Sequence, residues 1–132
     1  MKRMRIYYIS LVIGVMMVLA GAAPLRAGAG GEATSFFTSI QDMPLMPGLV
    51  ELPDQTVIFD KPEGRIIESV ASLESVSPEA IKAYYESTLP QLGWQRIADG
   101  SFVRKDERLQ LNFESYGGEN YLRLMVAPKD GF

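Results

Sequence analysis

The side chains of this chain that are able to act as nucleophiles, acids or bases are carboxylates, serines, lysines and tyrosines, because the sequence contains no His and no Cys. This composition excludes His-based triads, Cys–His pairs, His or thiolate metal sites and disulfides. The nucleophilic arrangement that remains is a dyad of Lys82 with Ser77 or Ser87. We expect Lys82 on a solvated helix face, where an ammonium group is a poor base, and Ser77 as a helix cap. The sequence therefore predicts no catalytic residues.

Two groups of acidic residues are candidates for a cation site or an acid–base pair. Asp54, Asp60 and Glu63 lie near a predicted turn, and carboxylate oxygens bind hard cations. Their spacing matches no EF-hand loop, and neighbouring basic residues compete for the same carboxylates. Asp106 and Glu107 are adjacent on another turn, where side chains diverge and nothing desolvates them. We predict solvated turns at both places, with no metal and no cofactor.

The first 29 residues have the composition of a secretory signal. Residues 1–5 include three bases and no acid, residues 6–23 carry no charge, and small residues follow Pro24. This order is typical of a signal peptide. Ala27-Gly28-Ala29 fits the cleavage pattern, so Gly30 would be the first mature residue, with cuts after Ala22 or Ala27 as competitors.

The alternative to cleavage is a retained membrane anchor. The apolar run 6–23 reaches the short end of the length that spans a bilayer. Both interpretations carry residues 30–132 across the membrane, since the positive flank stays inside. We predict a periplasmic or secreted protein, and as the alternative an inner-membrane protein with a periplasmic domain.

Residues 30–54 form a Pro-rich segment. The apolar run 43–49 is unlike a free linker, so we predict an extended arm laid over the core, with a short helical turn at 36–40. The alternative is a disordered tether. Apolar residues outside regular elements, Met above all, suit adaptable contacts with a partner protein. The predicted partner-binding residues are Phe36, Phe37, Met43 and Met46.

The pattern of residues 55–128 predicts one α+β domain. Ser77 and Pro78 begin a helix that ends by Gly93, and its apolar residues recur on one face. Alternating and β-branched runs predict strands at 56–60, 65–73, 94–98, 101–105, 108–114 and 121–127. The expected order is β-β-α-β-β-β-β, an antiparallel meander with the amphipathic helix packed on one face.

Five aromatic residues have two interpretations. The periodicity of these residues favours a position in the core for most of them. Alternatively, if a groove lies between the helix and the sheet, they line a cavity for a small apolar ligand. They are Tyr84, Tyr85, Trp94, Phe102 and Phe113.

Three stretches of the chain carry a resemblance. The run from Pro78 to Trp94, which ends in Leu-Pro-x-Leu-Gly-Trp, together with residues 42–49 and 59–66, is similar to an uncharacterised family of short secreted proteobacterial envelope proteins. The resemblance covers residues 40–128 approximately. The helix and the strands that follow it also resemble, more weakly, the helix-grip repeats of the outer-membrane assembly lipoprotein BamC. These resemblances imply a location in the cell envelope and supply no catalytic residues.

The net charge of residues 30–132 limits the classes of partner that this chain is expected to bind. Removal of residues 1–29 leaves nine basic against sixteen acidic residues. An acidic domain is repelled by phosphate backbones and anionic lipid surfaces, so we predict no nucleic-acid partner. The expected function is that of a non-enzymatic envelope domain that binds another protein by a sheet edge or by the arm. The alternatives are a carrier of a small apolar ligand and an enzyme that uses only carboxylates, Ser, Lys and Tyr.

Overall fold

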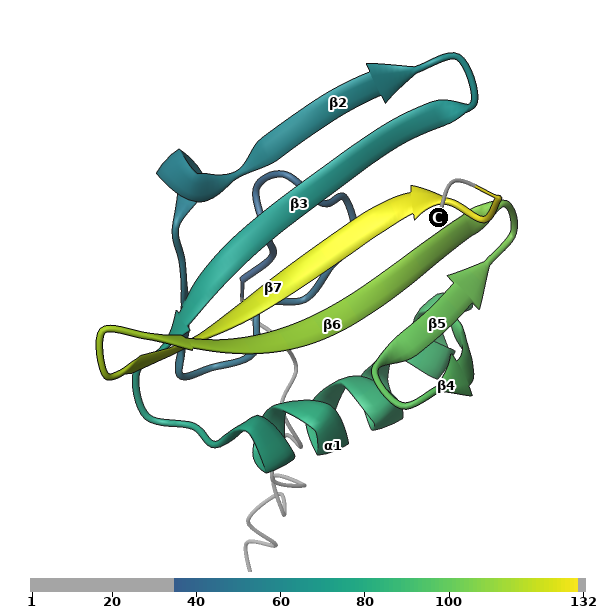
Figure 1. Cartoon of the computed structure of the whole chain (residues 1–132). Coiled ribbons are helices and arrows are strands. Elements are labelled where there is room, and N and C mark those ends of the chain that lie inside the picture. Colours follow the sequence, from purple (N-terminus) through teal and green to yellow (C-terminus); the bar gives the residue numbers. More distant parts are fainter. Residues whose placement is uncertain (1–34, 131–132) are drawn as a thin grey trace, which may run out of the picture.

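The computed structural model describes residues 35–130, which form one antiparallel sheet of seven strands and one α-helix (Figure 1). The predicted signal or anchor, residues 1–29, lies outside the described residues. The α+β class is confirmed. The elements are β1 Leu49–Glu51, β2 Val57–Lys61, β3 Gly64–Leu73, α1 Pro78–Thr88, β4 Gln95–Ala98, β5 Ser101–Arg104, β6 Glu107–Tyr116 and β7 Glu119–Pro128, with 3₁₀ helices at Pro53–Gln55 and Leu89–Leu92.

The strand order across the sheet is β1-β3-β7-β6-β5-β4, and β2 pairs with β3 on the same side as β1. The predicted meander holds for β4 to β7, but the sheet as a whole is not a meander, because β3 pairs with β7. The chain leaves β3, crosses the sheet through α1 and enters β4 at the far edge. The edges of the sheet are therefore β1 with β2 on one side and β4 on the other. Strand β1 lies inside the segment that we expected to be an arm.

Helix α1 begins and ends where its sequence predicts. The Ser77 hydroxyl accepts a 3.2 Å hydrogen bond from the backbone N–H of Ala80, and Pro78 takes the first helical position. Pro90 has no N–H to continue the α-helical ladder, so the helix tightens into a 3₁₀ turn. Gly93 closes that turn with φ +86°, a conformation that costs other residues steric strain.

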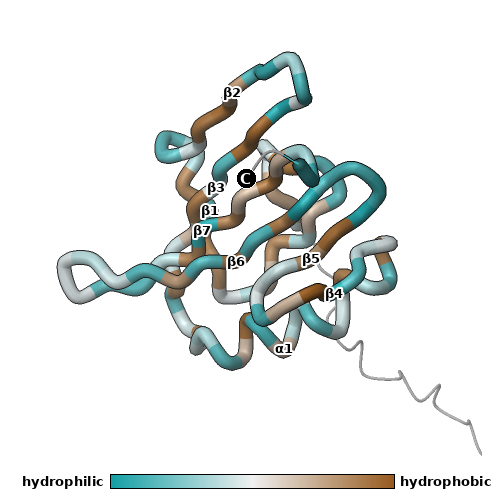
Figure 2. The backbone as a smooth tube through the Cα atoms, turned by 45° about the vertical axis from the view of Figure 1, so that its right-hand side comes forward, coloured by the Kyte–Doolittle hydropathy of each residue, from teal (hydrophilic) through white to brown (hydrophobic). Residues whose placement is uncertain are grey.

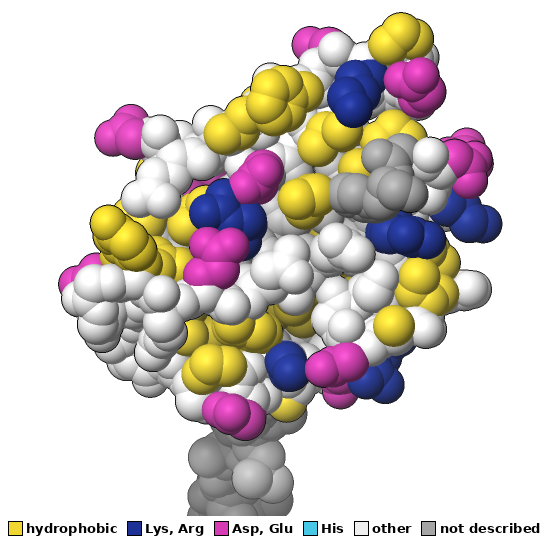
Figure 3. Space-filling model, in the orientation of Figure 1, with side chains coloured by type: hydrophobic (Ala, Val, Ile, Leu, Met, Phe, Trp, Pro, Cys, Tyr) yellow, Lys and Arg dark blue, Asp and Glu magenta, His cyan; other side chains and the backbone are white. Residues whose placement is uncertain are grey.

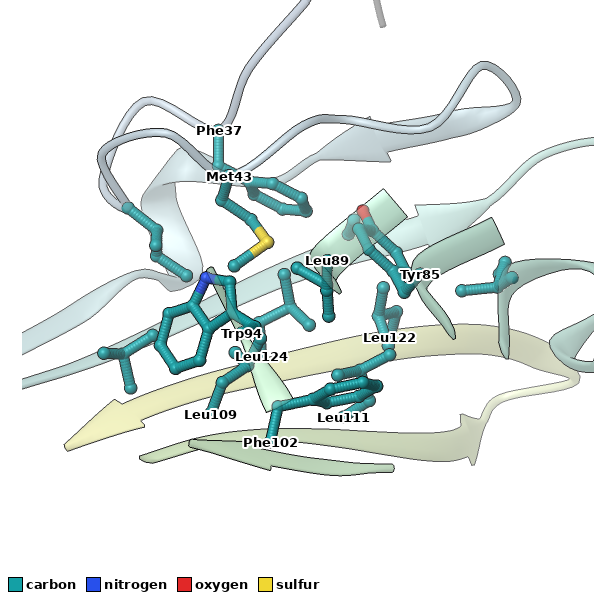
Figure 4. Packing of buried hydrophobic residues seen from close by; sticks show 14 of the residues in the cluster. Phe37, Met43, Tyr85, Leu89, Trp94, Phe102, Leu109, Leu111, Leu122 and Leu124 are labelled. Carbon is teal, nitrogen blue, oxygen red and sulfur yellow. The ribbon is translucent and has the colours of Figure 1, made fainter. Parts of the chain in front are cut away.

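The core lies between α1 and one face of the sheet (Figure 4). The helix contributes Ile81 and Tyr85, and the 3₁₀ turn that follows it contributes Leu89, each fully buried. The predicted alternation along the last two strands is confirmed, since their apolar residues fill the same core; these are Leu109, Leu111, Leu122, Leu124 and Val126. Trp94 and Phe102 complete it with exposed fractions of 2% and 1%.

The described part of the arm, residues 35–54, contributes buried side chains to this core. The helical turn expected at 36–40 is wrong: Phe36 instead forms an isolated β-bridge with Pro44, and Phe37 N–H donates to the Met43 carbonyl at 2.9 Å. A loop folded back in this way turns its apolar side chains to the sheet, where Phe37 and Met43 join the buried cluster. Within residues 35–130 no helix is both long and apolar enough to cross a membrane.

Candidate functional site

The four residues predicted to bind a partner do not form a common exposed surface. Phe37 and Met43 are 4% and 1% exposed, and Met46 is partly buried against the core. Phe36 alone of the four is well exposed, at 56%. The expected exposure is therefore wrong for Phe37 and Met43, because burial of apolar side chains draws the folded arm onto the helix and sheet.

Each residue of the candidate Ser–Lys dyad forms a hydrogen bond with another group. Lys82 donates to the Asp99 carboxylate at 3.1 Å, next to the β4–β5 turn. Ser77 caps the helix, and the Ser87 hydroxyl donates to the Tyr84 carbonyl at 3.0 Å. The Lys82 side chain is 40% exposed and paired, which fits the predicted solvated helix face.

The two acidic groups are spread over turns. Asp60 accepts from Arg65 at 3.0 Å, the competition expected from the sequence, and Glu107 lies 3.6 Å from Arg104. In the described part of the chain no three His, Cys, Asp or Glu side chains come together as a metal site.

Three of the five aromatic residues are fully part of the core, and one of these, Trp94, also borders the cavity described below. Tyr85, Trp94 and Phe102 are buried in the core, and Tyr84 and Phe113 pack against it. The interpretation as core residues is confirmed.

The first surface that stands out is strand β2, where an apolar run lies in solvent. Val57, Ile58 and Phe59 are 38%, 50% and 54% exposed, and both remaining residues of the strand are exposed too. One side of β2 pairs with β3, and its other side is an edge without a neighbouring strand among residues 35–130. Figure 2 shows this apolar strand at the outer margin of the fold, away from α1. The sequence predicts the strand, but nothing in its local pattern shows that its side chains stay uncovered.

The opposite edge strand, β4, is protected in ways that β2 is not. It is four residues long and its register shifts between Arg96 and Ala98. Arg96 is held by Glu86 at 3.3 Å and Asp99 at 3.7 Å. Bulges and charged side chains are the usual means by which edge strands avoid pairing with other chains.

The sheet face opposite the helix carries one ionic group at its centre (Figure 3). Arg123 of β7 donates to both oxygens of Glu114 at 3.0 Å, and it also contacts Glu68 of β3. The hydrogen bonds from the Arg123 guanidinium lower the pKa of Glu114 below its ordinary value. Because each charge has a partner, this face offers no free charge at its centre.

The second surface is a cavity of about 480 Å³ on the helix side of the sheet. Its walls come from the arm at residues 39–42, the β2–β3 turn at 63–65, the β5–β6 turn and the end of β7. Trp94 lies at the cavity, and the Arg104 guanidinium carbon lies 4.4 Å from the centre of a Trp94 ring. Arg104 also donates to the Leu92 carbonyl at 3.2 Å, so its position over the ring is fixed.

Comparisons of this chain with protein-family models, curated proteins and solved structures give no match.

Proposed function

We propose that this chain is an exported, non-enzymatic domain of the cell envelope that binds an extended segment of a partner protein along the free edge of β2. The observation that carries the proposal is the run Val57, Ile58 and Phe59, exposed on a strand whose outer edge has no neighbour among residues 35–130. Exposed apolar edge strands promote unwanted association, so native proteins protect them or use them. Strand β4 has a register shift and an ion-paired Arg96 in its middle, whereas the charged residues of β2 lie at its end, beyond the apolar run, which favours use.

The geometry of β2 defines the partner. An extended peptide that adds a strand satisfies the free backbone groups, and alternate side chains then meet the two faces of the sheet. Val57 pairs in register with Glu68, and Phe59 with Ile66, so both face the side opposite the helix, whereas Ile58 faces the helix side. We expect a partner segment with apolar residues at alternate positions and few prolines, because proline removes a backbone donor.

The export part of the proposal rests on residues 1–29 and is tested by the mass of the protein recovered from cells. A chain that begins at Gly30 supports a cleaved signal, and an intact Met1 end in the membrane fraction supports the anchored alternative. An intact Met1 end in the cytosol contradicts export.

The edge part is tested by in-cell crosslinking, with a photoreactive amino acid in place of Asp60, next to Phe59. We expect a discrete adduct with a partner protein, lost when Phe59→Lys is added, because a lysine on an edge opposes strand addition. Ile97→Lys is the matched control, since Ile97 is 51% exposed on the other edge. An adduct that survives Phe59→Lys, or one with twice the mass of the chain, contradicts the proposal.

A further inference from the structure

The cavity beside Trp94 has the size of a small-ligand site and takes no part in the edge interaction. Its volume of about 480 Å³ lies within the range of ordinary ligand pockets. Four segments distant in sequence meet there, so its shape depends on the whole fold rather than on one loop.

The inner part of the cavity is apolar. Ile67 and Pro128 are its partly exposed apolar residues, and Ile40, Trp94 and Val126 behind them are 4%, 2% and 5% exposed. A ligand that reaches this part must bring an apolar body, because an unpaired polar group against these side chains would lose its hydrogen bonds to water.

The rim of the cavity has an excess of negative charge. Four carboxylates and two guanidinium groups line it. The guanidinium of Arg65 is paired with Asp60 outside the cavity, and that of Arg104 is held over Trp94 and by Leu92. The acids at the rim without an ion pair within residues 35–130 are Asp42, Glu63 and Asp106.

A buried hydroxyl at the same cavity has no hydrogen-bond partner. The Ser39 Oγ is inaccessible to solvent and unpaired within the described residues, and Ser39 is part of the lining. Buried polar atoms in folded proteins nearly always have a partner. The lining therefore includes one residue whose hydroxyl has no partner among residues 35–130.

From these observations we infer that the cavity binds a primary ammonium group carried on a short apolar chain, such as an alkylamine or a lysine side chain. The apolar chain covers the partly exposed side chains of Ile67 and Pro128, and the ammonium group lies among the rim carboxylates. The inference does not rest on the proposed edge interaction, and Phe59→Lys should leave it unchanged.

The purified protein allows a direct test, since Trp94 is the one tryptophan of the whole chain and its fluorescence reports the cavity. The probes are hexylamine, hexanol and hexanoate, which share one chain length and differ in charge. We expect a saturable change with hexylamine, a weaker one with hexanol and the weakest with hexanoate. Hexanoate that binds as well as hexylamine, or no saturable change with hexylamine, overturns the inference.

A charge-matched pair of variants separates the site from the net charge. Asp42→Asn with Glu63→Gln should weaken hexylamine about tenfold, as expected for the loss of two exposed charge interactions. Asn suits position 42, where φ is +61°. Asp54→Asn with Glu74→Gln removes the same charge elsewhere and should have little effect. Equal effects of the two pairs overturn the inference.

The source of the ammonium group is distinguished by a further probe, N-acetyl-lysine N-methylamide. If it binds more tightly than hexylamine, the natural ligand is a lysine side chain of a protein; if less tightly, a free amine is favoured. Whichever probe binds more tightly, its fluorescence signal must saturate and must weaken in the Asp42/Glu63 double variant. If neither probe gives a saturable signal, the proposed site is contradicted.

Discussion

The hydroxyl of Tyr85, on the buried face of α1, donates a 2.7 Å hydrogen bond to the carbonyl oxygen of Pro44 in the arm. The two residues are 41 positions apart in the chain, and both are buried. The bond joins the helix to the arm across the apolar cluster that contains Phe37 and Met43. The arm is therefore held by a directional contact as well as by apolar burial.

Tyr85→Phe removes this contact while it preserves the ring. The Pro44 carbonyl then stays buried without its donor, so we expect a loss of about 1–2 kcal/mol in the free energy of unfolding. Urea unfolding of the wild type and the variant measures the difference. A loss below about 0.5 kcal/mol would mean that water replaces the hydroxyl at Pro44.

The same tyrosine predicts a loss of stability at alkaline pH. Burial raises the pKa of Tyr85 well above the ordinary value of 10.0. The folded state disfavours the phenolate, whereas the tyrosine of the unfolded chain ionises freely near its ordinary pKa. The contribution of the neutral Tyr85 to the free energy of unfolding is therefore fully present below about pH 10 and is lost as the pH rises further. Between about pH 8 and about pH 11 the wild type should lose more stability than Tyr85→Phe, which has no group to ionise there. Parallel pH profiles of the two proteins would contradict this.

Two adjacent phenylalanines test the burial of the arm. Phe37 is 4% exposed and Phe36 is 56% exposed, so the same substitution at the two positions samples opposite environments. Phe37→Ala should destabilise the protein by about 3–5 kcal/mol through loss of burial and the cavity that remains. Phe36→Ala should change the stability by less than about 0.5 kcal/mol. Similar effects at both positions would mean that the arm leaves the core in solution.

The helix and the strands were predictable because their signals are local. Ser77, Pro78 and Gly93 define the two ends of the helical segment by the backbone geometry each one favours, and the structure confirms all three. The alternation along β6 and β7 depends only on the two-residue period of a strand, so it identified the buried face without knowledge of the neighbours.

Strand pairing and exposure were not predictable, because they depend on residues distant in the chain. The pairing of β3 with β7 joins segments about fifty residues apart, and it replaces the simple meander that local turns favour. Val57 and Phe59 have the composition of core residues, but they face the side of the sheet opposite the helix, whereas the arm and the helix pack on the other face. Phe37 and Met43 lie in irregular chain, where no period distinguishes a buried side chain from an exposed one.

Trp94 links the core to the cavity, so its truncation should affect stability and binding together. The side chain is 2% exposed and packs among the largest buried residues of the sheet. Trp94→Ala should therefore cost about 3–5 kcal/mol in urea unfolding.

Tyr116→Ala provides the control for this truncation, since Tyr116 is 82% exposed on β6 and its loss should cost less than about 0.5 kcal/mol. The Trp94→Ala protein loses its fluorescence reporter, so its hexylamine binding must be followed by amide chemical shifts of Ile67 and Val126. We expect that signal to weaken, because the nearly buried ring helps to shape the cavity and its loss disturbs the surface on which the alkyl chain lies. A cost below about 1 kcal/mol would show that the ring is not a core residue, since even partial cavity formation exceeds that value.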